Sequence, residues 1–480
     1  MEKILNYING ELLEPTDGEY IDNFEPAKGG VYSLIAKSNQ KDVDKAVVAA
    51  KAAFKSWSET TKDERAAVLY RISALIEENL EMLAQAESKD NGKPVSLARQ
   101  VDIPRAAHNI RFFSSSILHF ASESHAMENK AINYTLRKPI GVAACISPWN
   151  LPLYLFTWKI APALAVGNCV IAKPSEVTPM TAYLFSKLCI EAGLPKGVLN
   201  ILHGLGHEVG AAMISHKEIP VISFTGGTKT GENIAKVAAP MFKKLSLELG
   251  GKNPAIIFDD CNYDKMLRTT LRSSFANQGQ ICLCGSRIFV QKGIYEKFKK
   301  DFVAAVKQLK VGNPISEDTD QGALVSETHK NKVLEYIDLA KTEGGKILCG
   351  GREVNLAEAG LNGWFIAPTV IEGLPYNCRT NMEEIFGPVV TIMPFETEDE
   401  VLLYANATKY GLASTLWTEN LSLANRMANE IHAGIVWINC WLLRDLRTPF
   451  GGVKSSGVGR EGGFEALHFF TEPKNVCIKY

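Results

Sequence analysis

Cysteine occurs in this chain but is never arranged in the pairs that metal sites or disulfide frameworks need. The ten cysteines are scattered between Cys145 and Cys477, and no Cys-x-x-Cys spacing occurs among them. Scattered thiols are typical of a reducing compartment. The N-terminal residues also lack the apolar run of a secretion signal. We therefore expect a cytoplasmic protein without a bound metal.

The chain also lacks an excess of charge of either sign. Its 52 Lys and Arg residues are balanced by 53 Asp and Glu, which leaves a net charge of −1. A nucleic-acid partner is disfavoured because no basic field would attract it. An apolar content of 46% and a charged content of 22% are typical of a soluble globular protein. A length of 480 residues predicts two or three domains.

One long uncharged run, residues 139–158, has about the length of a membrane span. It contains Pro148, Asn150 and Pro152, which would break a helix and leave polar groups unpaired in lipid. The run therefore predicts a buried strand followed by a functional turn, and no membrane partner is expected.

Three helical segments are predicted in the first 120 residues. Residues 43–57 and 103–119 carry apolar side chains at helical spacing. Between them, a helix begins at a capping box formed by Thr61 and Glu64 and continues to Asn91, where the sequence Asn-Gly-Lys-Pro stops it. These helices are expected to form a packed scaffold.

From Gly141 onward, apolar strands and helices alternate, and a second series of the same kind runs from Pro254 to about residue 450. Such alternation is typical of a parallel sheet with helices on both faces, which binds ligands at the carboxyl ends of its strands. Residues 132–144 alternate as a hairpin would, and its edge can pair with another subunit. The tail strand at 476–478 is expected to add to this hairpin sheet.

A cysteine ends the glycine-containing stretch from Phe275 to Cys282, which leads toward a strand at 288–290. Backbone amides at such a turn can point at the sulfur and lower its pKa. This is how a nucleophilic thiolate is usually held. A buried structural cysteine is the alternative, and the stretch alone does not decide between the two.

Two turns that follow strands are candidates for binding a dinucleotide. Residues 224–231 follow an apolar strand and open a helix, so their glycines and the helix N-terminus can approach a pyrophosphate; a plain tight turn is the alternative. Glu176 can accept both hydroxyls of an adenosine ribose and would repel a 2′-phosphate, which favours NAD over NADP. Lys173 keeps NADP possible, and a solvated turn is the alternative for both residues.

Two polar residues are candidates for acid–base and oxyanion chemistry. Asn150 lies in a proline-stiffened turn and can donate its amide to an oxyanion, although asparagine is also common in such turns for backbone reasons. Glu248 lies among apolar residues, where burial would raise its pKa and make it a general base; a half-exposed strand glutamate is the alternative.

Taken together and in order, seven motifs resemble the aldehyde dehydrogenase superfamily over essentially the whole chain. They are Ser147-Pro148-Trp149-Asn150, Lys173-Pro174-Ser175-Glu176, Phe224-Thr225-Gly226, Glu248-Leu249-Gly250-Gly251-Lys252, Gly279-Gln280-Ile281-Cys282, Glu384-Ile385-Phe386-Gly387-Pro388 and Pro449-Phe450-Gly451-Gly452.

The resemblance implies an α/β architecture in three parts, and the hairpin and tail indicate a homodimer or homotetramer. A Rossmann-like parallel-sheet domain for NAD is expected from residues 1–122 and 142–248. An α/β catalytic domain is expected from residues 249–450. A small β oligomerisation extension is expected from residues 123–141 and 451–480.

The resemblance also implies roles for individual residues. Cys282 would attack the aldehyde to give a thiohemiacetal, and Asn150 with the Cys282 N–H would hold its oxyanion while hydride passes to the nicotinamide. Glu248 would then activate the water that hydrolyses the thioester. Many relatives have serine where Gly227 stands, so a side-chain contact to phosphate is expected to be missing. The expected cofactor contacts are Ile146, Trp149, Lys173, Glu176, Gly206, Phe224, Gly226, Gly227, Leu249, Glu384 and Phe386.

A narrower resemblance is to the muconic semialdehyde dehydrogenases, whose substrates carry a carboxylate far from the aldehyde. It rests on residues 103–105, 109–113 and 439–447. Arginine binds a carboxylate with a planar fork, so Arg111 and Arg444 are predicted to form a substrate clamp. The alternative is a structural ion pair, for example between Arg444 and Asp445. Further predicted substrate contacts are Leu155, Trp158 and Phe450.

Three other functions remain open from the sequence. One is an acylating enzyme that passes the thioester to coenzyme A, which the presence of Glu248 disfavours. Another is a broad-specificity or betaine-type aldehyde dehydrogenase. The last is a structural protein of the crystallin kind, which would be expected to have lost Cys282, Glu248 or Asn150.

Overall fold

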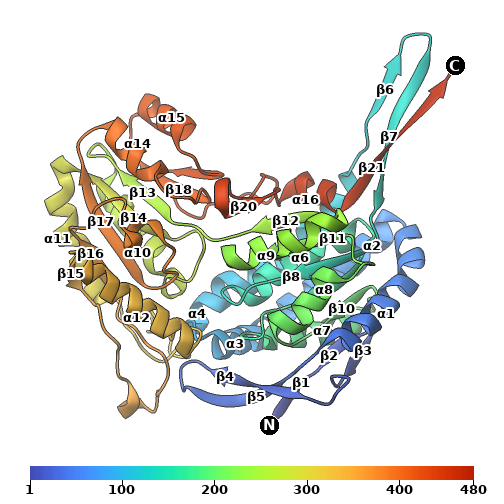
Figure 1. Ribbon diagram of the computed structural model, residues 1–480, viewed down its shortest axis with the longest axis horizontal. Coiled ribbons are helices and arrows are strands. Elements are labelled where there is room, and N and C mark those ends of the chain that lie inside the picture. The colour runs from blue at the N-terminus through green and yellow to red at the C-terminus, as the bar shows by residue number, and fades with distance from the viewer.

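Two large sheets and one projecting β extension organise the computed structural model, which describes residues 1–480 (Figure 1). The mixed α/β architecture with two mostly parallel sheets confirms the predicted fold class. The helices are α1 (Gln40–Glu59), α2 (Lys62–Glu78), α3 (Leu80–Asn91), α4 (Val95–Leu97), α5 (Ile103–Ser116), α6 (Pro152–Ala165), α7 (Met180–Glu191), α8 (Ala211–Ser215), α9 (Thr228–Ala238), α10 (Tyr263–Phe275), α11 (Lys292–Gln308), α12 (Glu327–Thr342), α13 (Arg379–Met382), α14 (Glu398–Asn406), α15 (Leu421–Glu430) and α16 (Gly463–Phe469).

The first sheet has eight strands and a parallel centre. In spatial order its strands are β20 (Gly457–Val458), β12 (Lys244–Glu248), β11 (Val221–Thr225), β8 (Val142–Ile146), β9 (Cys169–Lys173), β10 (Leu199–Ile201), β2 (Asn6–Ile8) and β3 (Glu11–Leu13). The five strands from β12 to β10 are parallel, and the strands at both edges are antiparallel. Every residue of β8 and β9 is buried, as parallel strands covered on both faces require.

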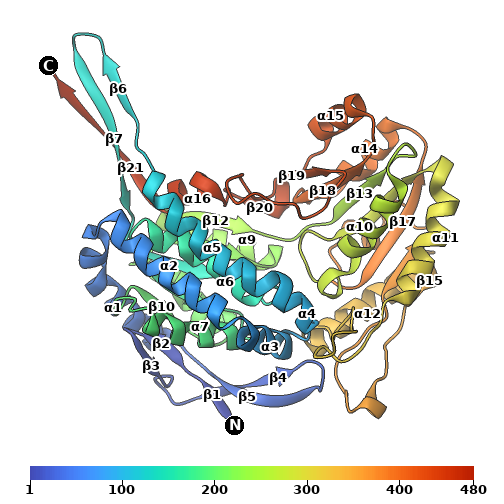
Figure 2. The same ribbon diagram turned by 180° about the vertical axis from the view of Figure 1, so that it is seen from behind.

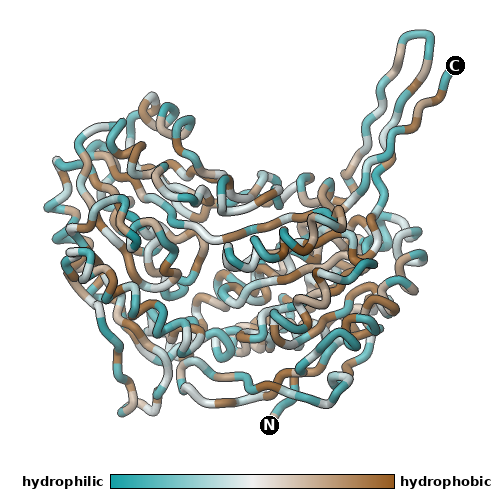
Figure 3. The backbone as a smooth tube through the Cα atoms, in the orientation of Figure 1, coloured by the Kyte–Doolittle hydropathy of each residue, from teal (hydrophilic) through white to brown (hydrophobic).

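Helices cover both faces of this sheet. Helices α2, α5 and α6 pack together on one face (Figure 2), while α8 and α9 lie over the other (Figure 1). One apolar core joins these layers. Hydrophobic colouring follows its interior strands, whereas hydrophobic and hydrophilic segments are mixed along the projecting extension (Figure 3).

The second sheet has seven strands, and all but one of its pairings are parallel. In spatial order they are β15 (Lys346–Cys349), β16 (Thr369–Glu372), β17 (Val389–Phe395), β14 (Gly285–Gln291), β13 (Asn253–Ile257), β18 (Ala413–Trp417) and β19 (Ile435–Ile438). The short segment 249–252 connects β12 of the first sheet to β13 of the second. The junction of the two sheets therefore follows directly after Glu248.

Two smaller sheets complete the fold. One contains β1 (Glu2–Ile4), β5 (Gly30–Ala36) and β4 (Tyr20–Glu25). The other is the projecting extension, in which β7 (Ala131–Pro139) lies between β6 (Ser124–Met127) and β21 (Thr471–Lys479). The pairing of β21 with β7 confirms that the tail adds to the hairpin sheet, and the C-terminus lies near its tip (Figure 1).

Several local predictions are confirmed and two need correction. The capping box of Thr61 and Glu64 begins α2, but the helix ends at Glu78 and α3 starts anew at Leu80, because Asn79 leaves helical geometry. The hairpin predicted over 132–144 is shifted, since it is formed by β6 and β7 and ends at Pro139. The run 139–158 contains the buried strand β8 and a turn, as predicted, and no helix of the protein has the length and apolar character to cross a membrane.

Candidate active site

Three cavities meet at the junction of the two large sheets. Thr225, the last residue of β11, borders all three, and Cys282 borders two of them. One cavity is a cleft at the carboxyl ends of β8, β9 and β11, the second is a polar pocket, and the third is a mostly apolar cavity. Cys282 therefore separates a polar chamber from an apolar one.

The loop that presents Cys282 has an unusual backbone. Asn277 and Gln278 have φ values of 52° and 55°, in the left-handed region that few side chains adopt. Gly279 follows with φ 68°, and a Cβ there would collide with the carbonyl oxygen of Gly387. The chain is fixed further by the Asn253 amide, which donates to the carbonyl of Cys282 at 2.7 Å. The sulfur is thus carried by a tightly held turn.

The thiol of Cys282 does not have the lowered pKa that the sequence predicts. Burial raises it, and the nearby carboxyl groups of Glu384 and Glu248 raise it further, while Arg444 opposes them. The predicted effect of backbone amides is therefore wrong for this state of the site, because loss of water and two acidic neighbours outweigh it.

Asn150 lies in the polar pocket with Cys282, after β8. Its side chain is buried, and one N–H of its amide donates to the carbonyl of Gln280 at 2.9 Å. The second N–H of the same amide is left for another acceptor. Asn150 and Cys282 thus meet as the sequence predicts, although they are far apart in the chain.

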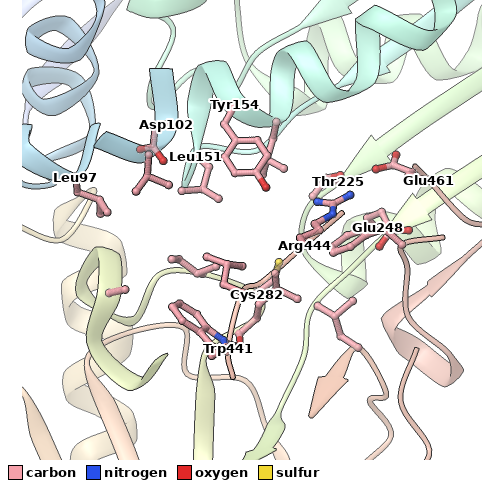
Figure 4. A pocket seen from close by; sticks show the side chains of 18 of the residues that line it. Leu97, Asp102, Leu151, Tyr154, Thr225, Glu248, Cys282, Trp441, Arg444 and Glu461 are labelled. Carbon is pink, nitrogen blue, oxygen red and sulfur yellow. Dashed lines mark hydrogen bonds between the residues drawn. The ribbon is translucent and has the colours of Figure 1, made fainter. Parts of the chain in front are cut away.

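Glu248 ends β12 on the wall of the apolar cavity, buried and with neither carboxylate oxygen hydrogen-bonded (Figure 4). Burial raises its pKa well above the usual value, and the charge of Glu461 raises it further. The Lys159 ammonium donates to Glu461 at 2.8 Å and to Ser223 at 3.0 Å. Lys159, Ser223 and Glu461 are thus hydrogen-bonded to one another near Glu248, without a hydrogen bond to it, and Lys159 and Glu461 were missed by the sequence analysis.

The cleft at the ends of β8, β9 and β11 fits a dinucleotide. Lys173 donates to Glu176 at 2.9 Å, and the Gly206 N–H donates to the other oxygen of Glu176 at 3.4 Å. Burial opposes ionisation of Glu176, but Lys173 keeps its pKa below the usual value. Helix α9 begins after Gly227 without a side-chain cap, and no atom lies within 4 Å of a Cβ built at Gly227. Free N–H groups and open space therefore face the cleft.

All eleven predicted cofactor contacts border the cleft or the polar pocket. The polar pocket also contains His329 and Lys332, which the sequence analysis missed. The ring of His329 packs against Trp149, and its Nε2 lies 2.7 Å from the carbonyl of Phe386. Both residues lie on α12 in a segment without any motif, so no local pattern could have identified them.

Arg444 lies on the wall of the apolar cavity, in view of Cys282 (Figure 4). Its guanidinium stacks over Trp158 and Phe450, with its carbon 4.2 Å and 3.9 Å from the two ring centroids. Its Nε and Nη2 are buried without a hydrogen-bond partner. Asp445 binds Arg447 instead, at 2.6 Å, so the predicted alternative pairing of Arg444 is wrong. Leu155 also borders the cavity as predicted.

Arg111 is not brought to this cavity. Its guanidinium binds Glu77 and lies 5.7 Å from the ring of Tyr70, on the outer side of α5. The structural ion pair, given as the alternative, is therefore what the structure contains. One turn and a half earlier on α5, Arg105 lies 5.7 Å from the ring of Tyr154, which lines the cavity, and its Nη1 is buried without a partner. Its charge helps to lower the pKa of Arg444.

Comparison with known proteins identifies the family. Residues 13–476 match the model of the aldehyde dehydrogenase family. The chain is 52% identical to a 2-aminomuconic semialdehyde dehydrogenase of Bos taurus, covering 99% of this chain and 98% of the relative. It is 43% identical to a 2-hydroxymuconic semialdehyde dehydrogenase of Pseudomonas sp. (strain CF600), covering all of both chains. The NAD+ complex of a Bacillus cereus aldehyde dehydrogenase superposes with a TM-score of 0.97 at 38% identity, covering 100% of this chain and 97% of that one.

The chain belongs to the aldehyde dehydrogenase family. It is an oxidoreductase that oxidises an aldehyde with a nicotinamide dinucleotide. The alternative of a crystallin-like structural protein is thereby set aside, and Cys282, Glu248 and Asn150 are all present at one site.

The raised pKa of Cys282 can be tested by alkylation. Because iodoacetamide reacts with the thiolate, the labelling rate of Cys282 in the protein without cofactor should keep rising past pH 8.5, the usual range of a thiol. The rate is measured by mass spectrometry of the Cys282 peptide, with the exposed Cys477 followed in the same digest as a reference. A midpoint at or below about 8.5 would show that backbone amides dominate after all.

Proposed function

We propose that this enzyme oxidises a carboxylate-bearing semialdehyde, such as 2-aminomuconate or 2-hydroxymuconate semialdehyde, to the corresponding acid with NAD. The observation that carries the proposal is the guanidinium of Arg444, which faces the cavity of Cys282 with two unpartnered donors. A buried donor without a partner is costly unless a ligand supplies the acceptor. Relatives from Bos taurus and Pseudomonas are named for such semialdehydes.

Arg105 takes the place that the sequence analysis gave to Arg111. Its unpartnered Nη1 and the effect of its charge on the pKa of Arg444 support a pair of guanidinium groups near one end of the substrate. Two such forks can bind the two oxygens of one carboxylate. The same positive charge disfavours a quaternary ammonium substrate, so a betaine-type activity is the weaker alternative.

Asn150 would stabilise the oxyanion that forms when Cys282 adds to the aldehyde. The Cys282 thiol would give its proton to the Glu248 carboxylate on the wall of the same cavity as its sulfur attacks the aldehyde carbon. The carbonyl oxygen would become an oxyanion that accepts a hydrogen bond from the free N–H of the Asn150 amide. Bound NAD would supply the acceptor for the hydride of the thiohemiacetal carbon. The polar pocket, with Glu384 and Phe386 on its wall, would hold the nicotinamide riboside beside Cys282.

Hydrolysis of the thioester would rest on Glu248. A glutamate whose pKa is raised by burial removes a proton from water more readily than one that ionises at low pH. The charge of Glu461 helps to keep the pKa of Glu248 high, which supports this role. A general base next to the thioester favours hydrolysis over transfer to coenzyme A, and acid formation without coenzyme A tests this point.

We also infer a preference for NAD, a homodimer or homotetramer, and a cytoplasmic location. The carboxylate of Glu176 in the cleft supports NAD because it would repel a 2′-phosphate. The extension of β6, β7 and β21 leaves both sheet edges unpaired, which supports pairing with another subunit. The ten free cysteines support a reducing compartment.

Replacing Arg444 should change substrate selectivity. We expect Arg444→Met to lower kcat/KM for 2-hydroxymuconate semialdehyde about 100-fold, as loss of charge-assisted hydrogen bonds predicts, and to affect hexanal far less. Steady-state NADH formation with both aldehydes measures this. Arg111→Met is the matched control and should leave selectivity unchanged, since Arg111 binds Glu77. An equal loss with both aldehydes for Arg444→Met would contradict the clamp.

Neutralising Glu461 should shift a pH profile. The charge of Glu461 raises the pKa of Glu248, so in Glu461→Gln the pKa of Glu248 falls and its basic form persists to lower pH. The acidic limb of thioester hydrolysis should therefore move to lower pH, measured as single-turnover acid formation. Glu465→Gln, an exposed glutamate on α16, serves as the control. A limb that stays in place or moves upward would count against this coupling.

Neutralising Glu176 should improve the use of NADP. In Glu176→Gln the repulsion of a 2′-phosphate is removed and Lys173 is freed to bind it, so kcat/KM with NADP should rise about tenfold relative to NAD. The ratio of the two cofactors is measured with one aldehyde at saturation. Glu191→Gln, exposed at the end of α7, should leave the ratio unchanged. If Glu176→Gln also leaves it unchanged, Glu176 does not select the cofactor.

A further inference from the structure

Hydrogen bonds from residues at the end of α3 and just after it fix the turn that carries Asn150. The Asn91 side chain donates to the carbonyl of Trp149 at 2.8 Å. The Lys93 ammonium donates to the carbonyl of Asn150 at 3.1 Å. The Asn-Gly-Lys-Pro sequence was predicted only to stop a helix, yet two of its side chains donate hydrogen bonds to consecutive carbonyls of the turn.

Lys93 is the centre of a fully buried cluster of charges. Its ammonium also binds Asp102 and lies 3.7 Å from Glu87, and all three side chains are completely inaccessible. Burial raises the pKa of Glu87 to about 7, and the charge of Asp102 contributes to this. With a proton on Glu87, one cation faces one anion, which is how a buried charge is tolerated.

The carbonyl of Asn150 is also where the cysteine loop attaches. Asn277, in its left-handed conformation, donates its amide to that same oxygen at 2.9 Å. One acceptor therefore joins the end of α3, the turn of Asn150 and the loop of Cys282. Gly92 makes this approach possible, because its φ is 86° and a Cβ there would lie 2.8 Å from the carbonyl oxygen of Ala323.

We propose that Lys93 is a positioning residue for aldehyde oxidation: anchored by Asp102 and Glu87, its ammonium fixes the carbonyl of Asn150 so that the amide of that residue faces the oxyanion. The backbone of Asn150 determines the direction of its side chain. Loss of a hydrogen bond to the backbone carbonyl therefore changes the orientation of the side-chain amide. The role rests on the proposed function of Asn150 as oxyanion donor.

Single-turnover NADH formation tests this in Lys93→Met, Asn150→Ala and the double variant. Lys93→Met keeps the length of the side chain but removes its donors, and we expect hydride transfer to slow about 10- to 100-fold, up to the loss seen when one oxyanion donor is removed. The double variant should be no slower than Asn150→Ala, because both changes disable one function. The dissociation constant of NAD should be unchanged. Lys89→Met, an exposed lysine of α3, should match the unmodified enzyme.

The outcomes separate the two proposals. If Asn150→Ala leaves hydride transfer at its normal rate, the oxyanion role fails and the positioning role fails with it. If Asn150→Ala is slow but Lys93→Met is not, or if the losses multiply in the double variant, only the positioning role is overturned. Should Lys93→Met not fold, Asn91→Ala, which frees the carbonyl of Trp149, replaces it with the same expected pattern at a several-fold loss.

Discussion

The active site depends on one geometric constraint, which is that two parallel sheets end on opposite sides of a single sulfur atom. The first sheet points its carboxyl ends at the site, bringing Thr225 and Glu248. The second sheet contributes from the amino ends of its strands, because Cys282 precedes β14 and Asn253 opens β13. With only residues 249–252 between β12 and β13, the sheets cannot separate far, so cofactor cleft and substrate cavity must share a boundary at Cys282.

Buried charge is the second theme of the site, and three examples show how it is arranged. Lys93 lies with Asp102 and Glu87, Lys159 lies with Glu461, and Arg444 has no acidic partner. Burial of ions is costly and is retained where it sets geometry, pKa or ligand choice. The cluster of Lys93 contacts Asn150, and the pair of Lys159 and Glu461 lies near Glu248. The guanidinium of Arg444, by contrast, lines the cavity.

The sequence was sufficient for the parts of the site that lie in motifs after strands. Asn150, Glu176 and Glu248 each follow or end an apolar strand, so their convergence at one edge of a sheet could be predicted. The roles of Lys159, Lys93 and Glu461 could not be predicted, because each depends on a contact with a residue far along the chain: Lys159 with Glu461, and Lys93 with the carbonyl of Asn150. The assignment of Arg111 to the substrate clamp was wrong because of helix geometry. Arg105 and Arg111 are six residues apart on α5, so Arg105 faces the side of the cavity and Arg111 faces solvent.

Strand β20 lies near the end of the chain, yet it forms the edge of the first sheet beside β12. Its residues pair with Leu247 and Glu248, and the neighbouring Ser456 donates to the carbonyl of Gly250 and accepts from the N–H of Gly411. A chain that is synthesised from its N-terminus therefore contains Cys282 and Asn150 before it contains the strand that pairs with Glu248, the general base. The surroundings of Glu248 can therefore be completed only once residues 456–458 have been added to the chain.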